Sequence, residues 1–312
     1  MALDKDKQAS AVYVALGDLY GHSGDYALAL QEYQKALEIN SSSASAYRGL
    51  AKTYQDDNKL QLAEEMAQKA IDRQPDDWRG YSQMGGFLFR SGKMAEAIPY
   101  FRRITELMPD NSNVFNNLGA ALYLSGDVES ATVAWQRSLE LEPTAIAYSN
   151  VGSGLFYLGR FDEAADLYQK AVELAPEHFE YWGNLGDAYR HSETLFELAE
   201  PFYRNAIKLA EERMKVNPVD ADTMSMLGHY HANVGEREQS LQYLAKATAL
   251  APQNFSVYYT SATALAALGD MDQAMQALDK AIELGYAKYL VRADAGLAVL
   301  RQQPGFEALT AE

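Results

Sequence analysis

Histidine and carboxylate side chains are the groups of this 312-residue sequence that could bind a metal ion or act as general bases. The five histidines are dispersed along the chain, at His22, His178, His191, His229 and His231. The last two are two residues apart on an expected helix, which places them on different sides of its axis. The chain has no cysteine, so disulfides, thiolate nucleophiles and zinc–thiolate sites are excluded. We therefore expect neither a metal site nor a cofactor.

Two glycine-containing segments have some likeness to nucleotide-binding loops. Ser91-Gly92-Lys93 lacks the upstream glycine of a phosphate-binding loop. Gly152-Ser153-Gly154 lacks the third glycine of the dinucleotide fingerprint and falls on an expected helix. Adjacent carboxylates, such as Glu64 and Glu65, fall on helical segments that we expect to face solvent. We therefore expect that the chain is not an enzyme.

The composition narrows the classes of partner. The chain has 27 Lys and Arg against 43 Asp and Glu, a net charge of −16, which argues against a nucleic-acid binder with a broad basic face. A hydrophobic content of 48% predicts an ordered core. There is no apolar run of the roughly 18 residues that a membrane span needs, and the first residues do not resemble a signal peptide. We expect a cytoplasmic protein, or a periplasmic or extracellular one if the chain is an excised domain.

Prolines and glycines mark a regular period. Six prolines are 34, 34, 33, 42 and 34 residues apart: Pro75, Pro109, Pro143, Pro176, Pro218 and Pro252. Five glycine pairs, each seven residues apart, follow the same period: Gly17/Gly24, Gly85/Gly92, Gly119/Gly126, Gly152/Gly159 and Gly228/Gly235. A period in the thirties predicts a repeat array in which each unit is one supersecondary motif.

Each unit carries two amphipathic patterns on either side of its second glycine. In residues 145–178, Tyr148, Val151 and Leu155 share one helical face, and Ala164 and Tyr168 share another. A proline then stands where the second helix must stop. The unit therefore predicts helix–turn–helix. Small residues recur at two places in each unit, which lets the two helices approach, and we expect the large aromatics to fill the space between units.

These residues resemble the tetratricopeptide repeat (TPR) family. The pattern Trp/Tyr-x2-Leu-Gly-x2-Tyr, then Ala, an aromatic residue, Ala and Pro, is present at Trp182–Leu185–Gly186–Tyr189 and Ala164–Tyr168–Ala171–Pro176. The resemblance implies an all-α, right-handed superhelical solenoid. It divides the chain into a lead-in at 1–9, eight units at 10–43, 44–77, 78–111, 112–144, 145–178, 179–220, 221–254 and 255–288, and a C-terminal cap at 289–312 that covers the last apolar face.

One unit departs from the pattern. Unit 179–220 is 42 residues long, and we expect the extra residues to extend its second helix, over roughly 194–216, beyond its neighbours. This extension is either a tolerated insertion or a docking edge.

Family geometry places the first helices of the units on the concave side of the superhelix. The implied groove residues are a row of asparagines (Asn117, Asn150 and Asn184), a row of aromatics (Phe89, Tyr123 and Phe156) and a basic cluster (Arg48, Lys52, Arg79 and Arg90). An asparagine row can pair with the backbone of an extended peptide, because each amide both donates and accepts. The alternatives are that asparagine merely suits a solvated face and that the aromatics are partly buried between neighbouring helices.

The charges of the expected groove differ between its two ends. Glu180, Asp187 and Asp222 make units 179–220 and 221–254 acidic, whereas the basic cluster lies in units 44–77 and 78–111. A groove with opposite charges at its ends would orient an extended ligand, which would be acidic where it meets the basic cluster.

We therefore expect a non-catalytic scaffold that binds a protein or an extended peptide in the groove, and no nucleic acid. A different class of function is a regulatory or sensor module of a larger signalling protein, since the chain also resembles TPR arrays attached to bacterial kinases and transcription regulators. A third is a structural spacer or self-assembling array.

Overall fold

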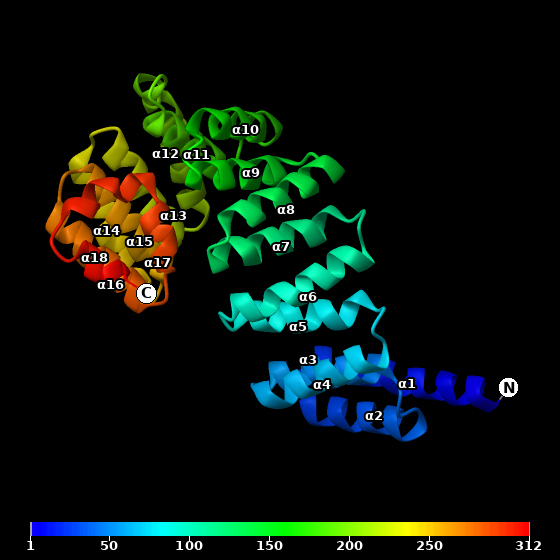
Figure 1. Cartoon of the computed structure of the whole chain (residues 1–312). Coiled ribbons are helices and arrows are strands. Elements are labelled where there is room, and N and C mark those ends of the chain that lie inside the picture. The colour runs from blue at the N-terminus through cyan, green and yellow to red at the C-terminus, as the bar shows by residue number, and fades with distance from the viewer. Residues whose placement is uncertain (1, 312) are drawn as a thin grey trace. The chain divides into compact units, whose positions relative to one another are not determined.

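The computed structural model describes residues 2–311, with side chains from residue 8 onward, and no strand occurs within this part of the chain (Figure 1). The chain divides into two compact bodies, one up to Leu122 and one from Tyr123 on. The boundary lies within one helix, and each body is described by itself. No helix in the described range is both long and apolar enough to cross a bilayer.

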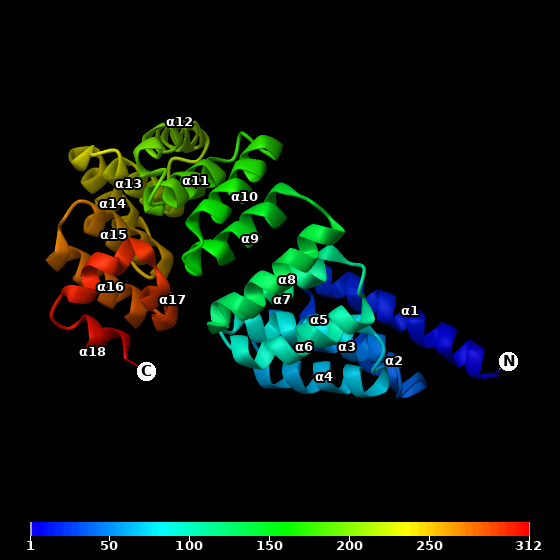
Figure 2. The ribbon, with the colours of Figure 1, turned by 45° about the horizontal axis from the view of Figure 1, so that its top comes forward.

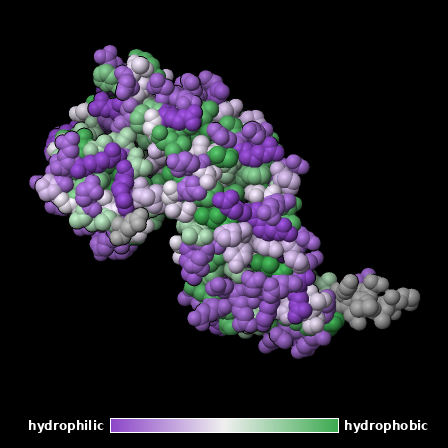
Figure 3. Space-filling view, viewed as in Figure 1, coloured by the Kyte–Doolittle hydropathy of each residue, from purple (hydrophilic) through white to green (hydrophobic). Residues whose placement is uncertain are grey.

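The first body consists of three helical hairpins and most of a seventh helix. Its helices are α1 (Ala2–His22), α2 (Tyr26–Ile39), α3 (Ala44–Asp56), α4 (Leu60–Arg73), α5 (Trp78–Arg90), α6 (Met94–Leu107) and α7 (Ser112–Ser125). Within each hairpin the two helices pack together, and α3 also contacts both α1 and α5 (Figure 2). The first helices of the three units therefore lie side by side. Hydrophilic residues cover most of the visible face over α2 and α4 (Figure 3).

The second body continues the pairing and ends in short helices. Its elements are α8 (Val128–Leu141), α9 (Ala145–Tyr157), α10 (Phe161–Leu174), α11 (Phe179–His191), the 3-10 helix η1 (Phe196–Leu198), α12 (Glu200–Val216), α13 (Ala221–Asn233), α14 (Arg237–Leu250), α15 (Phe255–Ala267), α16 (Met271–Glu283), α17 (Lys288–Ala293), the 3-10 helix η2 (Ala295–Gln302) and α18 (Phe306–Thr310). Together, α1 to α16 form about eight helix pairs, so the all-α repeat fold expected from the period is confirmed.

The recurring small residues have the packing role that the sequence indicates. A Cβ atom built on Gly17 would stand 2.6 Å from the Tyr33 ring, and one on Gly186 would stand 2.8 Å from the Tyr203 ring. Such approaches are far below van der Waals contact, so these helix pairs close only around a residue without a side chain. The buried aromatic ring of the second helix fills the space that the glycine leaves.

The extended unit is built differently from the sequence prediction. Its second helix, α12, has 17 residues against 13 or 14 in the other second helices, apart from the short C-terminal ones. However, α12 begins at Glu200, so the expected start near residue 194 is wrong. The Ser192 hydroxyl accepts the backbone N–H groups of Thr194 and Leu195 and ends α11 in a turn. Pro201 then lies in the first turn of α12, where its missing N–H is no loss.

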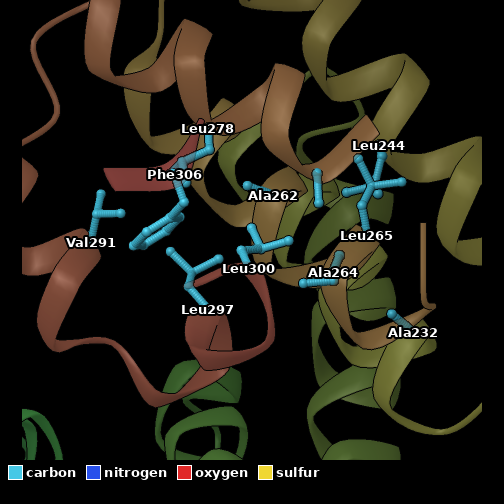
Figure 4. Packing of buried hydrophobic residues seen from close by; sticks show 12 residues of the cluster. Ala232, Leu244, Ala262, Ala264, Leu265, Leu278, Val291, Leu297, Leu300 and Phe306 are labelled. Atoms are coloured by element: carbon cyan, nitrogen blue, oxygen red, sulfur yellow. The ribbon is translucent and has the colours of Figure 1, made fainter. Parts of the chain in front are cut away.

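The C-terminal segment packs onto the last helix pair. Val291, Leu297, Leu300 and Phe306 are almost completely buried, in one cluster with side chains of α15 and α16 (Figure 4). The last repeat therefore does not leave this apolar surface open to solvent.

Candidate peptide-binding groove

Four cationic side chains of the first body line one cleft. Arg48 and Lys52 come from α3, and Arg79 and Arg90 come from α5. The cleft has a volume of about 750 Å³ and is completed by residues of α1, including Val14 and Asp18. The helices α1, α3 and α5 are the first helices of three successive units. The repeat therefore brings residues from three units to the same cleft. The structure thus gathers the whole basic cluster into one cavity.

A buried carboxylate holds two of the four cations in place. The Asp77 side chain is 7% exposed. One of its oxygens accepts a hydrogen bond from Arg48 Nη1 at 2.6 Å, and the other accepts one from Arg79 Nε at 2.8 Å. Asp77 also caps α5, because its Oδ1 accepts the backbone N–H of Arg79. Burial alone would raise the pKa of Asp77, but hydrogen bonds from Arg79 and the two guanidinium charges hold that pKa below its usual value.

The two guanidinium groups differ in their exposure to the cleft. The Arg48 side chain is only 16% exposed, and burial lowers its pKa from the usual value. The Arg79 side chain is 56% exposed, so it can offer N–H donors to a ligand while keeping its bond to Asp77. Asp77 holds both guanidinium groups in place. Arg48 is largely buried in the cleft wall, whereas Arg79 is exposed to solvent in the cleft.

The other two cations are more open. Lys52 Nζ lies 3.2 Å from Asp56 Oδ2, with the Lys52 side chain 60% exposed. Arg90 is exposed and has no ion-pair partner within the part of the chain whose side chains are described. An exposed ion pair such as Lys52–Asp56 contributes little to the free energy of folding. A ligand carboxylate can therefore replace Asp56 as the partner of Lys52 at small cost.

Uncharged groups complete the wall. Trp78, the first residue of α5, lines the cleft and is 39% exposed, so its ring can cover an apolar part of a ligand. Gln83 Nε2 donates to the backbone carbonyl of Arg48 at 2.9 Å, and its buried Oε1 has no hydrogen-bond donor among the described residues. The cleft therefore offers an apolar surface beside its cations.

The asparagine row is divided between the two bodies. Asn117 lies on α7 in the first body and is exposed. Asn150 and Asn184 lie on α9 and α11 of the second body, which contact each other, and both are half-buried. Asn184 Nδ2 donates a hydrogen bond to Ser149 Oγ at 3.4 Å. Part of the hydrogen-bonding capacity of the Asn184 amide is therefore used within the fold.

The aromatic row lies largely against neighbouring rings. In the first body, Phe89 meets the Phe101 ring edge-on at 6.2 Å between centroids. In the second body, Tyr123 lies 5.6 Å from Trp135 and 5.4 Å from Tyr157. Phe156 likewise lies 5.2 Å from Phe161 and 5.6 Å from His191. Each of the three rings is therefore half-buried beside neighbouring rings, and contact with a partner stays a prediction.

The carboxylates expected at the acidic end are engaged within the second body. Asp187 Oδ1 accepts the Tyr203 hydroxyl at 2.7 Å and lies 2.8 Å from His229 Nε2. Asp222 Oδ1 accepts Asn254 Nδ2 at 2.9 Å. Asp187 is therefore a carboxylate with two partners inside the fold, and the acidic end of the groove stays a prediction.

Sequence reasoning missed the residues that position the cations. Asp77 is the anchor of the cleft, and the signal for it was present, since an aspartate directly before an amphipathic pattern is a typical helix N-cap. The partner Arg48 lies 29 residues away and could not be assigned without the geometry of the stack. Within the described residues, no group of three or more His, Asp or Glu side chains could hold a metal ion.

Comparisons with known proteins bear on the repeat fold and not on the cleft. Three family models described as tetratricopeptide repeat match residues 8–76, then 48–112, 88–146 and 152–213, and finally 234–286. No curated protein sequence is significantly similar to the chain.

Solved structures show the same fold. The MamA protein is 20% identical with a TM-score of 0.52, over 57% of this chain and 97% of its own. PilF of Pseudomonas aeruginosa is 24% identical with a TM-score of 0.54, over 69% of this chain and 94% of its own. These two likenesses concern the fold alone. The family models, in contrast, match well over half of the sequence, and the chain therefore belongs to the tetratricopeptide repeat family.

Proposed function

We propose that this protein is a non-catalytic scaffold that binds an extended acidic segment of a partner protein in the cleft between α1, α3 and α5. The observation that carries the proposal is the convergence of Arg48, Lys52, Arg79 and Arg90 on one cleft of a chain whose net charge is −16. Cations gathered in one cleft make a local positive field on a protein of net negative charge, and an acidic ligand is the kind of ligand that such a field attracts.

Carboxylate groups of a protein partner fit the cleft better than neutral groups do. A guanidinium group presents a planar fork of N–H donors that matches a carboxylate in two parallel hydrogen bonds. Asp77 fixes Arg48 and Arg79 before a ligand arrives, so less side-chain entropy is lost on binding. We infer that Asp or Glu side chains of the partner meet Arg79 and Arg90, the two exposed arginines of the cluster.

Other groove residues would add backbone and apolar contacts. Trp78 would pack against an apolar side chain of the partner, next to its acidic residues. Asn117 is exposed and would pair with a peptide group of the ligand, as the first member of the asparagine row. Asn150 and Asn184 would do the same in the second body. Phe89, Tyr123 and Phe156 are half-buried and would contribute apolar contacts through their exposed parts.

Charge reversal in the cleft tests the proposal. The probe is a fluorescein-labelled peptide of alternating Glu and Ala residues, with a Gln–Ala peptide as the uncharged counterpart. We expect wild-type protein to bind the Glu peptide, and Arg79→Glu/Arg90→Glu to weaken it by about tenfold or more, because attraction becomes repulsion. Asn117→Ala should weaken it less. Fluorescence anisotropy titration measures each dissociation constant.

The matched control is Arg73→Glu/Arg102→Glu. Both arginines are exposed residues of the first body, on α4 and α6, outside the cleft. This variant changes the net charge by the same amount. An equal loss of affinity in the control would show that the peptide responds to overall charge, and equal binding of the two peptides would rule out carboxylate recognition.

A further inference from the structure

One face of the first helix carries large apolar side chains that are open to solvent. On α1, Val12 is 59% exposed and Leu19 is 63% exposed, and Ala15 between them is exposed as well. Residues three and four positions apart lie side by side on a helix surface. The three side chains therefore form one continuous row, which we call the α1 stripe.

The same register positions are buried in the later units of the first body. Ala46 and Thr53 on α3 hold the positions of Val12 and Leu19 one unit later, and they are 0% and 2% exposed. Phe87 on α5 holds the position of Leu19 two units later and is 7% exposed. These first helices pack on the second helix of the preceding unit, α3 on α2 and α5 on α4. The stripe is thus exposed where its counterparts are covered by a helix.

Close contacts show what this face of a first helix binds. Gly49 on α3 holds the position of Ala15, and a Cβ atom built on it would stand 2.2 Å from the ring of Tyr33 on α2. Gly80 on α5 holds the position of the first stripe residue, and its Cβ atom would stand 3.0 Å from the side chain of Ile71 on α4. The register of the α1 stripe is therefore that of a surface on which another helix lays its apolar side chains.

The α1 stripe is complementary to a second copy of itself. When two α1 helices lie antiparallel about a two-fold axis midway between Val12 and Leu19, Val12 of each copy faces Leu19 of the other. The small Ala15 then lies next to the axis, where it lets the two helix backbones approach. The larger side chains fill the space on either side of the axis, so one pairing buries the whole stripe of both copies.

The charges near the stripe do not oppose this pairing. The chain has a net charge of −16, but the stripe has no charged residue, and Gln8, which extends it by one turn, is uncharged and exposed. Asp18 lies on a different side of α1, where it lines the basic cleft. Two copies therefore meet without like charges inside the contact, and the repulsion between the rest of the two chains is screened by salt.

We propose that the α1 stripe is a self-association surface, on which a second copy of this chain binds through its own α1 in an antiparallel, two-fold arrangement. The second copy takes the place that a preceding second helix has in the later units. Because one helix face is a small interface, the dimer is a weak one. The proposal does not depend on the ligand of the basic cleft, which lies on another side of α1.

Sedimentation equilibrium of the full chain, from about 1 μM to about 1 mM, tests the surface. We expect the average mass to rise from monomer towards dimer, and to rise further at higher salt. Val12→Asp/Leu19→Asp should weaken dimerisation by about tenfold or more, because it places carboxylates in an apolar contact. The control is Val216→Asp/Val219→Asp, which adds the same charge at valines of the second body that are 87% and 67% exposed.

Two outcomes of this measurement would overturn the proposal. One is a wild-type chain that stays monomeric over the whole range of concentration. The other is an equal loss of dimer in the control variant, which would show a response to overall charge and not to the stripe. Because all four substituted side chains are exposed, we expect both variants to keep the wild-type circular dichroism spectrum.

Disulfide trapping tests the two-fold arrangement itself. The chain has no cysteine, so a single substitution gives a single thiol. Oxidation of Ala15→Cys should give a covalent dimer, because next to the axis the two Cβ atoms approach to the roughly 4 Å that a disulfide needs. Leu19→Cys should give little, since this position faces Val12 of the other copy, whereas Val12→Cys/Leu19→Cys should give dimer again. Equal trapping of Ala15→Cys and Leu19→Cys would contradict the antiparallel pairing.

Discussion

At the scale of single residues, Asp77 does most to define the candidate groove. It caps α5, neutralises part of the charge of Arg48 and Arg79, and keeps both guanidinium groups in the cleft wall. The basic residues could be found in the sequence because the repeat register placed them on first helices. The carboxylate that orders them could not be assigned to them, because its contact to Arg48 crosses from one unit to the next.

Removing this carboxylate should destabilise α5 locally. We expect Asp77→Ala to cost about 2–4 kcal/mol, the sum of a lost helix cap and lost charge-assisted hydrogen bonds. The control is Asp76→Ala, where an 88% exposed carboxylate meets Arg103 at 3.3 Å and should contribute less than about 1 kcal/mol. Native-state hydrogen exchange in α5 measures the difference. Equal effects of the two substitutions would contradict the role of Asp77.

The same residue should give the first body an acid-sensitive stability. The folded pKa of Asp77 is lower than its unfolded value, so its contribution is present above about pH 4 and is lost as the pH falls through the folded pKa. Asp77→Asn should remove this dependence. Exchange rates in α5 measured over a series of acidic pH values check the sign, and a variant that keeps the wild-type slope would contradict it.

His229 predicts the opposite dependence in the second body. Burial alone would lower the pKa of His229, but the Asp187 charge and their hydrogen bond raise it above its usual value. Its stabilisation is therefore present below about pH 6.5 and is lost as the pH rises through the folded pKa. We expect His229→Gln to flatten the fall of the thermal midpoint on the alkaline side. His178→Gln, at an exposed histidine of the same body, should leave that fall unchanged.

At the scale of elements, the helix pairs follow from two simple features of the sequence. Glycines such as Gly17 and Gly186 let an aromatic ring of the second helix pack directly on the backbone of the first. Prolines follow the ends of most second helices, and the spacing of these prolines predicts the boundaries of the units. The start of α12 was predicted wrongly because the Ser192 side chain stabilises a local turn in place of helix. Such a turn produces no periodic pattern in the sequence.

Two glycines on first helices should respond to alanine in opposite directions. Gly186→Ala brings a methyl group within 2.8 Å of the Tyr203 ring, and we expect a cost of about 1–3 kcal/mol from overpacking. At Gly86 the nearest atom to an added Cβ is the flexible end of Arg90, at 3.4 Å, so alanine should stabilise α5 by about 0.5–1 kcal/mol through its higher helix propensity. Urea denaturation followed by circular dichroism compares the two, and destabilisation by both would refute the packing account.

At the scale of the whole molecule, a periodic sequence predicted a periodic fold, and the contacts outside the period were the ones it missed. Two features follow directly from the repeat period, namely the all-α architecture and the number of units. The repeat register also brings together the four cations of the cleft, Arg48, Lys52, Arg79 and Arg90. The contact of Tyr289 with Tyr123 joins residues 166 positions apart and belongs to no repeat. The register of Asp187 predicts a carboxylate on the groove side, but it does not show that Tyr203 and His229 bind this side chain.

The central claim is that an acidic partner segment lies in the cleft formed by α1, α3 and α5. The most direct measurement is photo-crosslinking of the full chain with a Glu–Ala peptide that carries one benzoylphenylalanine, followed by mass spectrometric location of the crosslinked residues. We predict crosslinks at cleft residues such as Val14, Trp78 and Gln83, suppressed by excess unlabelled Glu peptide and lost in Arg79→Glu/Arg90→Glu. Crosslinks outside this cleft that the unlabelled peptide suppresses equally well would contradict the account.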